Sequence, residues 1–531
     1  MPQPEVPTSL LSLLSRSKVV AWDLDHTLAE YARRDKLQLI WSGLRAYLTA
    51  EAGWPAAVLP EVLDVAWCQP GIVVDTWAGH ALKLREDGVV LLAMLGLERC
   101  SGKPLGEVWP HMELLRSHAR HERYFCFLAG FDLPGIVAWM HLVQAVRAGV
   151  PGLPMKLSEV DAERPYLQVR EHLLGAFNHV FDNIEAFNTD RGLYFPAMKQ
   201  EPARWVSPQD RSMAALQLLR RSRQRHALVT NSHVQYAHLI ARAALGPAWR
   251  ALFTSVVVNA RKGGFFTSPG SPFYAVDAAG VQEGEVHTIL QADLPCSACA
   301  SKRPMAEAAE SQVACRGNAA ALRHLLSLDV AHPDCSTAST PWVSVELNVC
   351  PEHGSILPAM SRAKHSGADQ AIDTAALPHT GHALPVSAGL EDALSDAGDG
   401  GSEPESAGEG AELVVYIGDH IHGDVAAPAR AGWKSIAIVP AILHMSSEAR
   451  AALAAALQLP VFQSAATPAP GPESSLEGVG DSWGPLWQAE GGQCTYFASV
   501  IQQNAVAIVA SAGCVLDLCV QAQAKRDTSD P

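Results

Sequence analysis

The chain has 531 residues, of which 48% are hydrophobic and 18% charged, a composition that suits a globular protein of two or three domains. Its formal net charge of −15 disfavours binding to a nucleic-acid polymer or to an anionic membrane. The 11 cysteines are scattered and follow no secretory signal, so we expect free thiols in a reducing compartment, the cytoplasm.

The first element with a chemical signature is the stretch Lys18–Tyr31. Its apolar, partly β-branched start, Val19–Trp22, predicts a short buried parallel strand, and two carboxylates, Asp23 and Asp25, follow at once. In an open α/β sheet, ligands bind beyond the carboxyl ends of the strands, so these carboxylates are expected to face a substrate. Two neighbouring carboxylates repel each other, and a divalent cation relieves that repulsion. Taken alone, the same residues are also explained as a cap for the following helix.

Residues 49–199 contain no further predicted strand that is followed by candidate catalytic side chains. Helical periodicity runs over Leu37–Ala52, and alternation on both sides of Asp87-Gly88 predicts a β-hairpin. Another apolar helix is expected within Phe131–Gly149, with Asp132 as its cap. Because an insertion at this point of a doubly wound sheet covers the active site, we expect residues 49–199 to form a cap domain.

From residue 200 onward a strand–helix rhythm returns. Apolar strands are predicted at His226–Val229, Leu252–Val258 and Leu413–Ile417. The polar residues that follow them are, in order, Thr230 and Asn231, then Lys262, then Asp419 and Asp424. We therefore predict an α/β fold, a Rossmann-like doubly wound parallel sheet with an inserted α+β cap, whose core spans residues 1–48 and 200–464.

Two segments fall outside this rhythm. Residues 355–412 are rich in small and acidic residues, with 10 acidic and no basic residues between 366 and 412, and we expect a disordered acidic insertion there. Residues 465–531 are expected to form a linker and a C-terminal segment that packs back on the core. The most apolar window in that segment, Ala505–Leu516, is too short to span a bilayer, so we expect no membrane partner.

A cysteine-containing stretch offers a rival site. Cys296 and Cys299 have the spacing of zinc ligands, as do Cys350 and His353. These groups would have to converge from about fifty residues of partly flexible chain, so we expect free thiols rather than a structural zinc.

The side chains at the four strand ends are those that phosphoryl transfer through an aspartyl-phosphate requires. One carboxylate attacks phosphorus as the nucleophile, and a second protonates the leaving oxygen and then deprotonates water. A hydroxyl and an amide bind phosphate oxygens, while an ammonium group neutralises the charge on them. Acidic side chains at the last strand end hold Mg²⁺. Each position alone is explained as a helix cap, a turn or a surface group, but their order along the chain favours the catalytic reading.

The stretches WDLDHTLAEY, VTNSHVQY, NARKGGFF and YIGDHIHGDV resemble the four motifs of the haloacid-dehalogenase-like phosphohydrolases, and among them the cytosolic purine-type 5′-nucleotidases. The stretches DTWAGHALKLREDG and GFDLPG extend the similarity into the cap, so it covers most of residues 18–445. The combination of LAGFDLPG, GLYFP and RGNAAAL is similar to the branch of 5′-nucleotidase domain-containing proteins.

This resemblance implies a role for each matching position. Asp23 would be the nucleophile and Asp25 the general acid/base. Thr230 would supply the hydroxyl of the second motif, with Asn231 beside it for substrate binding, and Lys262 would supply the cation of the third. Mg²⁺ would be held by Asp23, the carbonyl of Asp25, Asp419 and Asp424.

The substrate-binding positions of the cap match the family less closely. By the resemblance, Phe131 stacks on the base and Asp132 contacts the nucleoside. The purine-type enzymes have Asn at the second position, and an acidic side chain would contact a purine differently. The basic residues with which those enzymes hold their substrate are not recognisable in Arg191–Trp205.

Together these features predict a Mg²⁺-dependent phosphomonoester hydrolase acting on nucleoside 5′-monophosphates through an aspartyl-phosphate. Two alternatives stay open: a weakly active or regulatory binding protein that keeps the site, and a nucleoside phosphotransferase. The expected partner is a small-molecule phosphomonoester, and a homo-oligomer is left open.

Overall fold

The structure, a computed structural model, describes residues 8–102, 105–112, 115, 123–155, 164–181, 187–219, 224–268, 273–276, 282–285, 313–317, 319–320, 322–323, 413–463, 478–488 and 493–529. The acidic insertion expected at 355–412 lies outside these ranges, as do the possible zinc ligands Cys296, Cys299, Cys350 and His353. Among the described residues, no helix is both long enough and apolar enough to cross a membrane.

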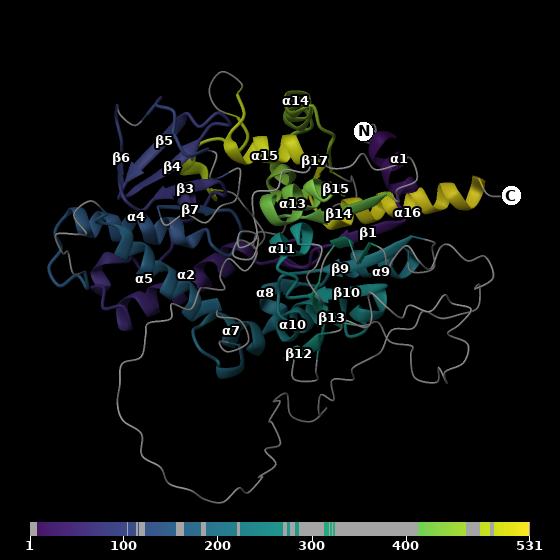
Figure 1. Ribbon diagram of the computed structural model, residues 1–531, viewed down its shortest axis with the longest axis horizontal. Helices are drawn as coiled ribbons and strands as arrows, with labels where there is room; N and C mark the ends of the chain where they lie inside the picture. The colour runs from purple at the N-terminus through teal and green to yellow at the C-terminus, as the bar shows by residue number, and fades with distance from the viewer. Residues whose placement is uncertain are drawn as a thin grey trace, which may run out of the picture.

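The described residues form three sheets, and the largest of them has ten strands, most of them parallel (Figure 1). Its parallel strands, in spatial order, are β13 (Val313–Arg316), β10 (Ser255–Val258), β9 (Arg225–Val229), β1 (Val19–Trp22), β14 (Val414–Gly418), β15 (Lys434–Ile438), β17 (Ala505–Val509) and β16 (Val461–Phe462). Beyond β13, the strands β11 (Phe273–Val276) and β12 (Gln282–Glu285) extend the sheet with antiparallel pairing.

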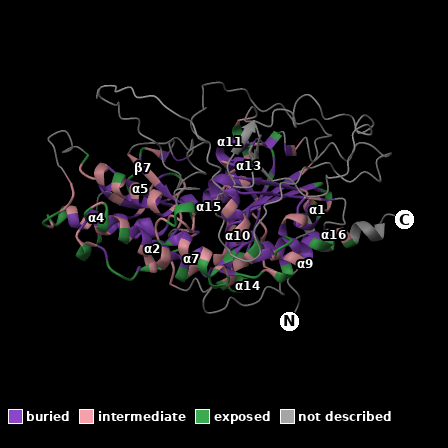
Figure 2. Cartoon of the chain, turned by 90° about the horizontal axis from the view of Figure 1, so that it is seen from below, coloured by how far each residue is buried: buried purple, intermediate pink, exposed green. Residues whose placement is uncertain are grey.

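Strand β1 lies inside this sheet, paired with β9 on one side and β14 on the other. Its side chains alternate between two apolar cores, Val20 and Trp22 in one and Val19 and Ala21 in the other, as strand geometry requires. Helices α1 (Thr8–Arg16), α9 (Asp210–Leu219), α10 (Val234–Leu245) and α16 (Ala512–Ser529) contribute to the first core, and α11 (Lys262–Thr267) and α13 (Ala427–Arg430) to the second. Figure 2 shows that buried residues concentrate along the sheets between these helices. Helices on both faces of a parallel sheet confirm the predicted doubly wound α/β fold.

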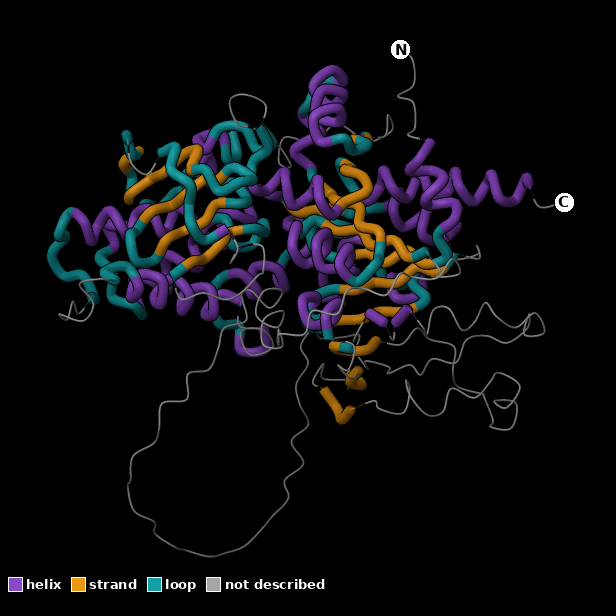
Figure 3. The backbone as a smooth tube through the Cα atoms, turned by 45° about the horizontal axis from the view of Figure 1, so that its top comes forward, coloured by secondary structure: helices purple, strands orange, loops and turns teal. Residues whose placement is uncertain are grey.

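The second sheet is antiparallel and lies within the predicted cap (Figure 3). Its strands, in spatial order, are β6 (Glu98–Arg99), β5 (Val90–Leu95), β4 (His80–Leu84), β3 (Ile72–Asp75) and β7 (Tyr124–Phe127). Strands β4 and β5 form the hairpin predicted around Asp87-Gly88. Helix α4 (Pro134–Arg147) packs on this hairpin, and α2 (Arg33–Ala50) and α5 (Leu167–Phe181) pack against α4 and against each other. The boundary expected between residues 48 and 49 falls in the last turn of α2, and the division into domains stays a prediction.

The remaining elements that the structure describes are short. The strands β2 (Glu30–Tyr31) and β8 (Val206–Ser207) form a two-stranded antiparallel pair. The other α-helices are α7 (Tyr194–Gln200), α8 (Pro202–Trp205), α14 (Ser447–Leu457) and α15 (Tyr496–Asn504). The 3₁₀-helices are Ala56–Val58, Val65–Trp67, Trp249–Leu252, Pro440–His444 and Asp481–Trp483, and Ile421–Ala426 is a π-helix.

The C-terminal segment contacts both sheets. Its apolar window supplies β17, which lies between β15 and β16, and the start of α16. Before this, the chain passes the cap, where the buried ammonium of Lys83 donates hydrogen bonds to the carbonyls of Trp483 (2.9 Å), Gly484 (3.2 Å) and Pro485. The side-chain amide of Gln69 donates to the carbonyls of Gly480 (3.0 Å) and Gly484 (2.9 Å). These contacts hold residues 480–485 against the cap sheet.

Candidate active site

The polar residues predicted at strand ends lie at one edge of the larger sheet. Strands β10, β9, β1 and β14 are consecutive neighbours and parallel, so their carboxyl ends meet at the same edge. Asp23 follows β1, Thr230 follows β9 and Asp419 follows β14, while Lys262 begins the helix a few residues after β10. The structure therefore brings together side chains that are almost 400 residues apart in the sequence.

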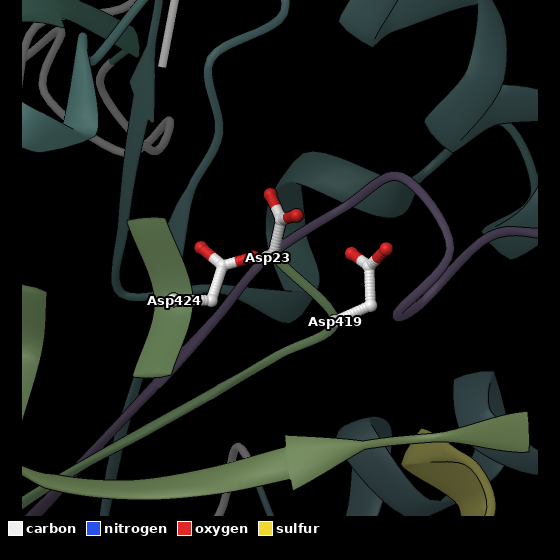
Figure 4. A group of neighbouring side chains, drawn as sticks. All are labelled: Asp23, Asp419 and Asp424. Carbon is white, nitrogen blue, oxygen red and sulfur yellow. The ribbon is translucent and has the colours of Figure 1, made fainter. Parts of the chain in front are cut away.

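The centre of the site is a cluster of three carboxylates, Asp23, Asp419 and Asp424 (Figure 4). One oxygen of each lies within 4.8 Å of the others. The ammonium of Lys262 is 2.6 Å from an oxygen of Asp23 and 2.6 Å from an oxygen of Asp424. Asp23, Asp424 and Lys262 are buried and Asp419 is half-buried. Within the cluster one positive charge faces three acidic groups, and a hard divalent cation fits the remaining imbalance.

The pKa values of these groups reflect the same excess of acidic groups over positive charge. Burial, opposed by Lys262 and reinforced by Asp424, raises the pKa of Asp23 well above its ordinary value. Burial and then Asp424 raise the pKa of Asp419 to about 7. Burial alone lowers the pKa of the Lys262 ammonium, but Asp23 and Asp424 outweigh it and raise that pKa. Carboxylates crowded in this way are stabilised in their charged form by a bound cation.

Asp424 reaches the cluster because the backbone around it is unusual. It lies in the π-helix Ile421–Ala426, a form of helix that often occurs at functional sites. One of its carboxylate oxygens accepts a hydrogen bond from the backbone N–H of His420 (3.1 Å), and the other accepts from Lys262. A methyl group on Gly418 would lie 2.5 Å from the Asp424 side chain, so this position has room only for glycine.

The carboxylate of Asp25 is separate from the cluster and is held by hydroxyl groups. The phenol of Tyr31 donates a hydrogen bond to one of its oxygens, and the hydroxyl of Ser232 donates to the other at 2.5 Å. The Tyr31 hydroxyl also lies 3.2 Å from that of Tyr236, which is 2.6 Å from the hydroxyl of Tyr194. Because a hydroxyl can donate or accept, this buried network can hold Asp25 in either protonation state.

The loops after β9 and β10 fix each other. The side-chain oxygen of Asn231 accepts the backbone N–H of Lys262 (2.9 Å), and the Thr230 hydroxyl accepts the backbone N–H of Ser232 (3.2 Å). Asn259 and Arg261 have positive φ angles, 45° and 52°, which non-glycine residues adopt at a cost of about 1 kcal/mol or more. Backbone strain just before Lys262 is therefore offset by the contacts that position its ammonium.

A cavity of about 760 Å³ adjoins the carboxylate cluster on its cap side. Asp419 belongs to both the cluster and the cavity wall. The polar part of the wall comes from seven residues, which are His26, Arg33, Lys36, Gln69, Asp419, His444 and Asp481. Most of the remaining wall is apolar and comes from α2, the cap, the segment 438–441 and the C-terminal segment 478–486 with Phe497. This volume is within the range of pockets that enclose small ligands.

Phe131 and Asp132 are not part of that wall. The Phe131 ring contacts the rings of His26, Tyr31, Phe181 and Tyr194. The carboxylate of Asp132 accepts backbone N–H groups of Leu128 and Ala129, each at 3.1 Å, and burial raises its pKa to about 7. The helix cap predicted for Asp132 is wrong, because Leu133 is the N-cap of α4 and no side chain caps it. The substrate contacts expected of Phe131 and Asp132 stay predictions.

Several residues at the site were not anticipated: Tyr31, Ser232, Gly418, Arg33 and Lys36. Tyr31 and Ser232 lie within the motif stretches. Their hydroxyl groups, close to Asp25 and Thr230 in the sequence, were the signal that could have placed them at the site. Gly418 directly precedes Asp419, where a turn was the simpler explanation. Arg33 and Lys36 belong to a charged run, which resembles a solvated helix face.

The sequence is similar to known proteins over its N-terminal part. Residues 11–331 match a family model described as the 5′ nucleotidase family. The chain is 28% identical to 5′-nucleotidase domain-containing protein 1 of Bos taurus and 29% identical to that of Homo sapiens, over 48% of this chain and 55% of each relative. It is 32% identical to 5′-nucleotidase domain-containing protein 2 of Homo sapiens, over 52% of this chain and 50% of the relative. The chain thus spans about half the length of the curated relatives it matches.

Proposed function

Because this chain belongs to the 5′ nucleotidase family, we propose that it is a Mg²⁺-dependent phosphomonoester hydrolase that releases phosphate from nucleoside 5′-monophosphates. The observation that carries the proposal is the cluster of Asp23, Asp419 and Asp424 with Lys262, which adjoins a cavity large enough for a nucleoside. The names of the relatives support the same reaction class. The motif resemblance extends the proposal to a haloacid-dehalogenase-like site and a cytoplasmic protein.

The donor set of the cluster fits Mg²⁺. This ion prefers oxygen ligands and is held in proteins by one or two carboxylates with water completing its shell. Asp23, Asp419 and Asp424 offer such oxygens within 4.8 Å of one another, and the Asp25 carbonyl is the further ligand that the resemblance implies. A bound Mg²⁺ would neutralise charge on the phosphoryl oxygens.

In the proposed reaction Asp23 and Asp25 divide the work. An oxygen of Asp23 forms a bond to phosphorus while the bond from phosphorus to the ester oxygen breaks, and Asp25 donates its proton to that oxygen. Water then attacks the aspartyl-phosphate, Asp25 takes a proton from it, and phosphate leaves Asp23. The hydroxyl network around Asp25 suits this alternation, because Tyr31 and Ser232 can reverse the direction of their hydrogen bonds.

The other residues of the sheet edge hold the transferred group. Lys262, fixed between two carboxylates, places its positive charge next to Asp23, where phosphate oxygens gather. The Thr230 hydroxyl lies on the adjoining loop, and the Asn231 side chain fixes the start of the Lys262 helix. The cavity takes the leaving group and shields it from water with its apolar wall.

The proposal is tested by measuring phosphate release from a panel of nucleoside 5′-monophosphates and sugar phosphates, with Mg²⁺ and after its removal with a chelator. We expect release from nucleotides that stops without Mg²⁺ and resumes when it is restored. The Asp23→Asn variant should fold and show no release, and a thermal melt checks the fold. Release that persists without a metal, or in Asp23→Asn, would contradict the proposal. Transfer of phosphate to added nucleoside would identify a phosphotransferase instead.

A further inference from the structure

Two cations of the cavity have no role in the reaction described above. Arg33 and Lys36 lie three residues apart in the first turn of α2, and both line the cavity beside Asp419. The residues assigned to the transferred phosphate, Asp23, Thr230 and Lys262, are not part of the cavity wall. Two sets of charged groups therefore meet at Asp419, one for the reacting phosphate and one for whatever occupies the cavity.

Lys36 is buried, and neighbouring side chains fix the position of its ammonium group. Its side chain is 1% exposed, and its ammonium contacts Nε2 of His26 and lies 3.8 Å from the centre of the Phe131 ring. Burial lowers the pKa of His26 well below its ordinary value, so its imidazole is neutral and orients the ammonium without balancing its charge. Within the part of the chain that the structure describes, neither Lys36 nor Arg33 forms an ion pair.

The position of these cations is electrostatically unfavourable without a ligand. They occupy the first turn of an 18-residue helix, where the helix dipole is positive and acidic groups are preferred. The N-cap residue, Ala32, provides no side chain to accept the free N–H groups. Burial and Arg33 together lower the pKa of Lys36 well below its ordinary value, and Asp25, Asp419 and Asp132 offset only part of this effect. An anion between the two side chains would relieve all three effects.

We propose that Arg33 and Lys36 bind a second anionic group on the leaving part of the substrate, so that the preferred substrate is a nucleotide with an acidic group in addition to the transferred phosphate. This inference rests on the proposed function. Two chemistries supply such a group: a base that is ionised near neutral pH, and a second phosphate on the ribose. The apolar wall of the cavity would then enclose the uncharged remainder of the nucleoside.

The test compares nucleotides in matched pairs with the full-length protein and Mg²⁺. The pairs are UMP with orotidine 5′-monophosphate, GMP with xanthosine 5′-monophosphate, and AMP with adenosine 3′,5′-bisphosphate. We expect kcat/KM to favour the member with the extra anion by about tenfold or more in at least one pair, as a charge-assisted hydrogen bond provides. The pair with the largest ratio identifies the acidic base or the second phosphate as the source.

Variants then locate the effect. Lys36→Met and Arg33→Met should each reduce the ratio of the two kcat/KM values by roughly ten- to a hundredfold. The kcat/KM of the nucleotide without the extra anion should change little. Arg34→Met is the matched control, because Arg34 lies in the same turn but is exposed and outside the cavity wall. Equal losses on both members of a pair would show that the cations serve the transferred phosphate or the fold, and would overturn the inference.

A binding measurement tests this inference independently of the proposed function. Calorimetry of the same pairs with Asp23→Asn measures affinity without turnover. Tighter binding of the more anionic member, lost in Asp23→Asn with Lys36→Met, supports the second-anion site even if the wild type releases no phosphate. A wild type that hydrolyses both members of every pair equally well, with equal affinities in Asp23→Asn, would overturn the inference and leave the phosphatase intact.

Discussion

The two sides of the active site are built in different ways. On the sheet side, Asp23, Thr230 and Asp419 follow neighbouring strands directly, and short-range hydrogen bonds fix Thr230 and Asp424 in the loops after β9 and β14. On the cap side, the cavity wall comes from segments far apart in the chain, joined by contacts such as that between Gln69 and Gly480. The sheet side is polar and crowded with acid, whereas the cap side is mostly apolar and contains two cations, Arg33 and Lys36, that form no ion pair with any described residue.

This difference indicates that the sheet side serves the reaction and the cap side selects the substrate. Every phosphomonoester presents the same phosphoryl group to the sheet side, so substitutions there should lower kcat for all substrates. In the proposed reaction only the leaving group reaches the cap side, so substitutions there should alter KM, substrate preference or stability. The following variants challenge that division, beginning with the largest expected effect.

The largest effect is expected for Gly418→Ala. The new methyl group would lie 2.5 Å from Asp424, so the carboxylate must move away from Lys262 and from the metal position. We expect kcat to fall by roughly 10²–10³-fold and the Mg²⁺ concentration needed for half-maximal activity to rise. Gly423→Ala is the control, because its methyl group would meet no atom closer than 3.5 Å. Normal turnover in Gly418→Ala would remove Asp424 from the site.

A smaller effect on the same side is expected for Tyr31→Phe. Asp25 loses one of its two hydroxyl partners, and Ser232 remains. We expect kcat to fall by about tenfold with KM nearly unchanged, because only proton transfer is impaired. Tyr236→Phe, one hydrogen bond farther from Asp25, should have less effect. A rise in KM without loss of kcat would assign Tyr31 to substrate binding instead.

On the cap side, Lys83→Met should act on stability and on KM. The variant leaves the carbonyls of Trp483, Gly484 and Pro485 without their shared donor, at a cost of roughly 1–3 kcal/mol in the free energy of unfolding. Because Gly484 and Pro485 also line the cavity, KM should rise severalfold while kcat changes little. Denaturant unfolding and steady-state kinetics measure the two effects.

The matched control for Lys83 is Arg85→Met. Arg85 lies just after the same strand, and its ion pair with Asp87 is partly exposed, so its removal should change stability much less than the removal of Lys83 does. A loss of kcat in Lys83→Met as large as that in Gly418→Ala would contradict the division between the two sides.

The smallest effect concerns Asp132→Asn and the pH dependence of stability. Burial raises the pKa of Asp132 to about 7 in the folded protein, from an ordinary value of 3.8. Between these values the unfolded chain ionises first, so this group makes stability fall as pH rises from about 4 to about 7 and contributes no further change above that. The variant should therefore melt with a flatter pH dependence in this range.

Asp35→Asn is the control for Asp132→Asn, because it makes the same exchange at a carboxylate on the exposed side of α2. An unaltered slope in Asp132→Asn would show that the carboxylate is solvated. A shift toward purine monophosphates would instead support the substrate contact expected from the family resemblance.

The sheet side could be predicted from the sequence because its signals are local. A buried apolar run followed directly by a carboxylate or a hydroxyl predicts both the strand and the position of the side chain, and β1, β9 and β14 agree with this. The parallel order of the strands then follows from the strand–helix rhythm, which is why the predicted fold is confirmed.

The cap side could not be predicted because its signals are long-range. The predicted helix began at Leu37, but α2 begins at Arg33. Its first turn is charged and gives no apolar periodicity, and two of its residues, Arg33 and Lys36, line the cavity. Lys36 resembled a solvated surface residue, and only the folded chain shows that it is buried beside His26. Lys83 likewise has partners about 400 residues away, which no local pattern indicates.

The central claim, that Asp23 becomes covalently phosphorylated, can be measured directly. The Asp25→Asn variant lacks the base that activates water, so incubation with Mg²⁺ and a hydrolysable nucleotide should trap the intermediate. Mass spectrometry of the acid-quenched protein should then show one added phosphoryl group, on the peptide that contains Asp23 and absent from the double variant Asp23→Asn/Asp25→Asn. Phosphate release by the wild type without any such label, or a label on a different residue, would contradict the account.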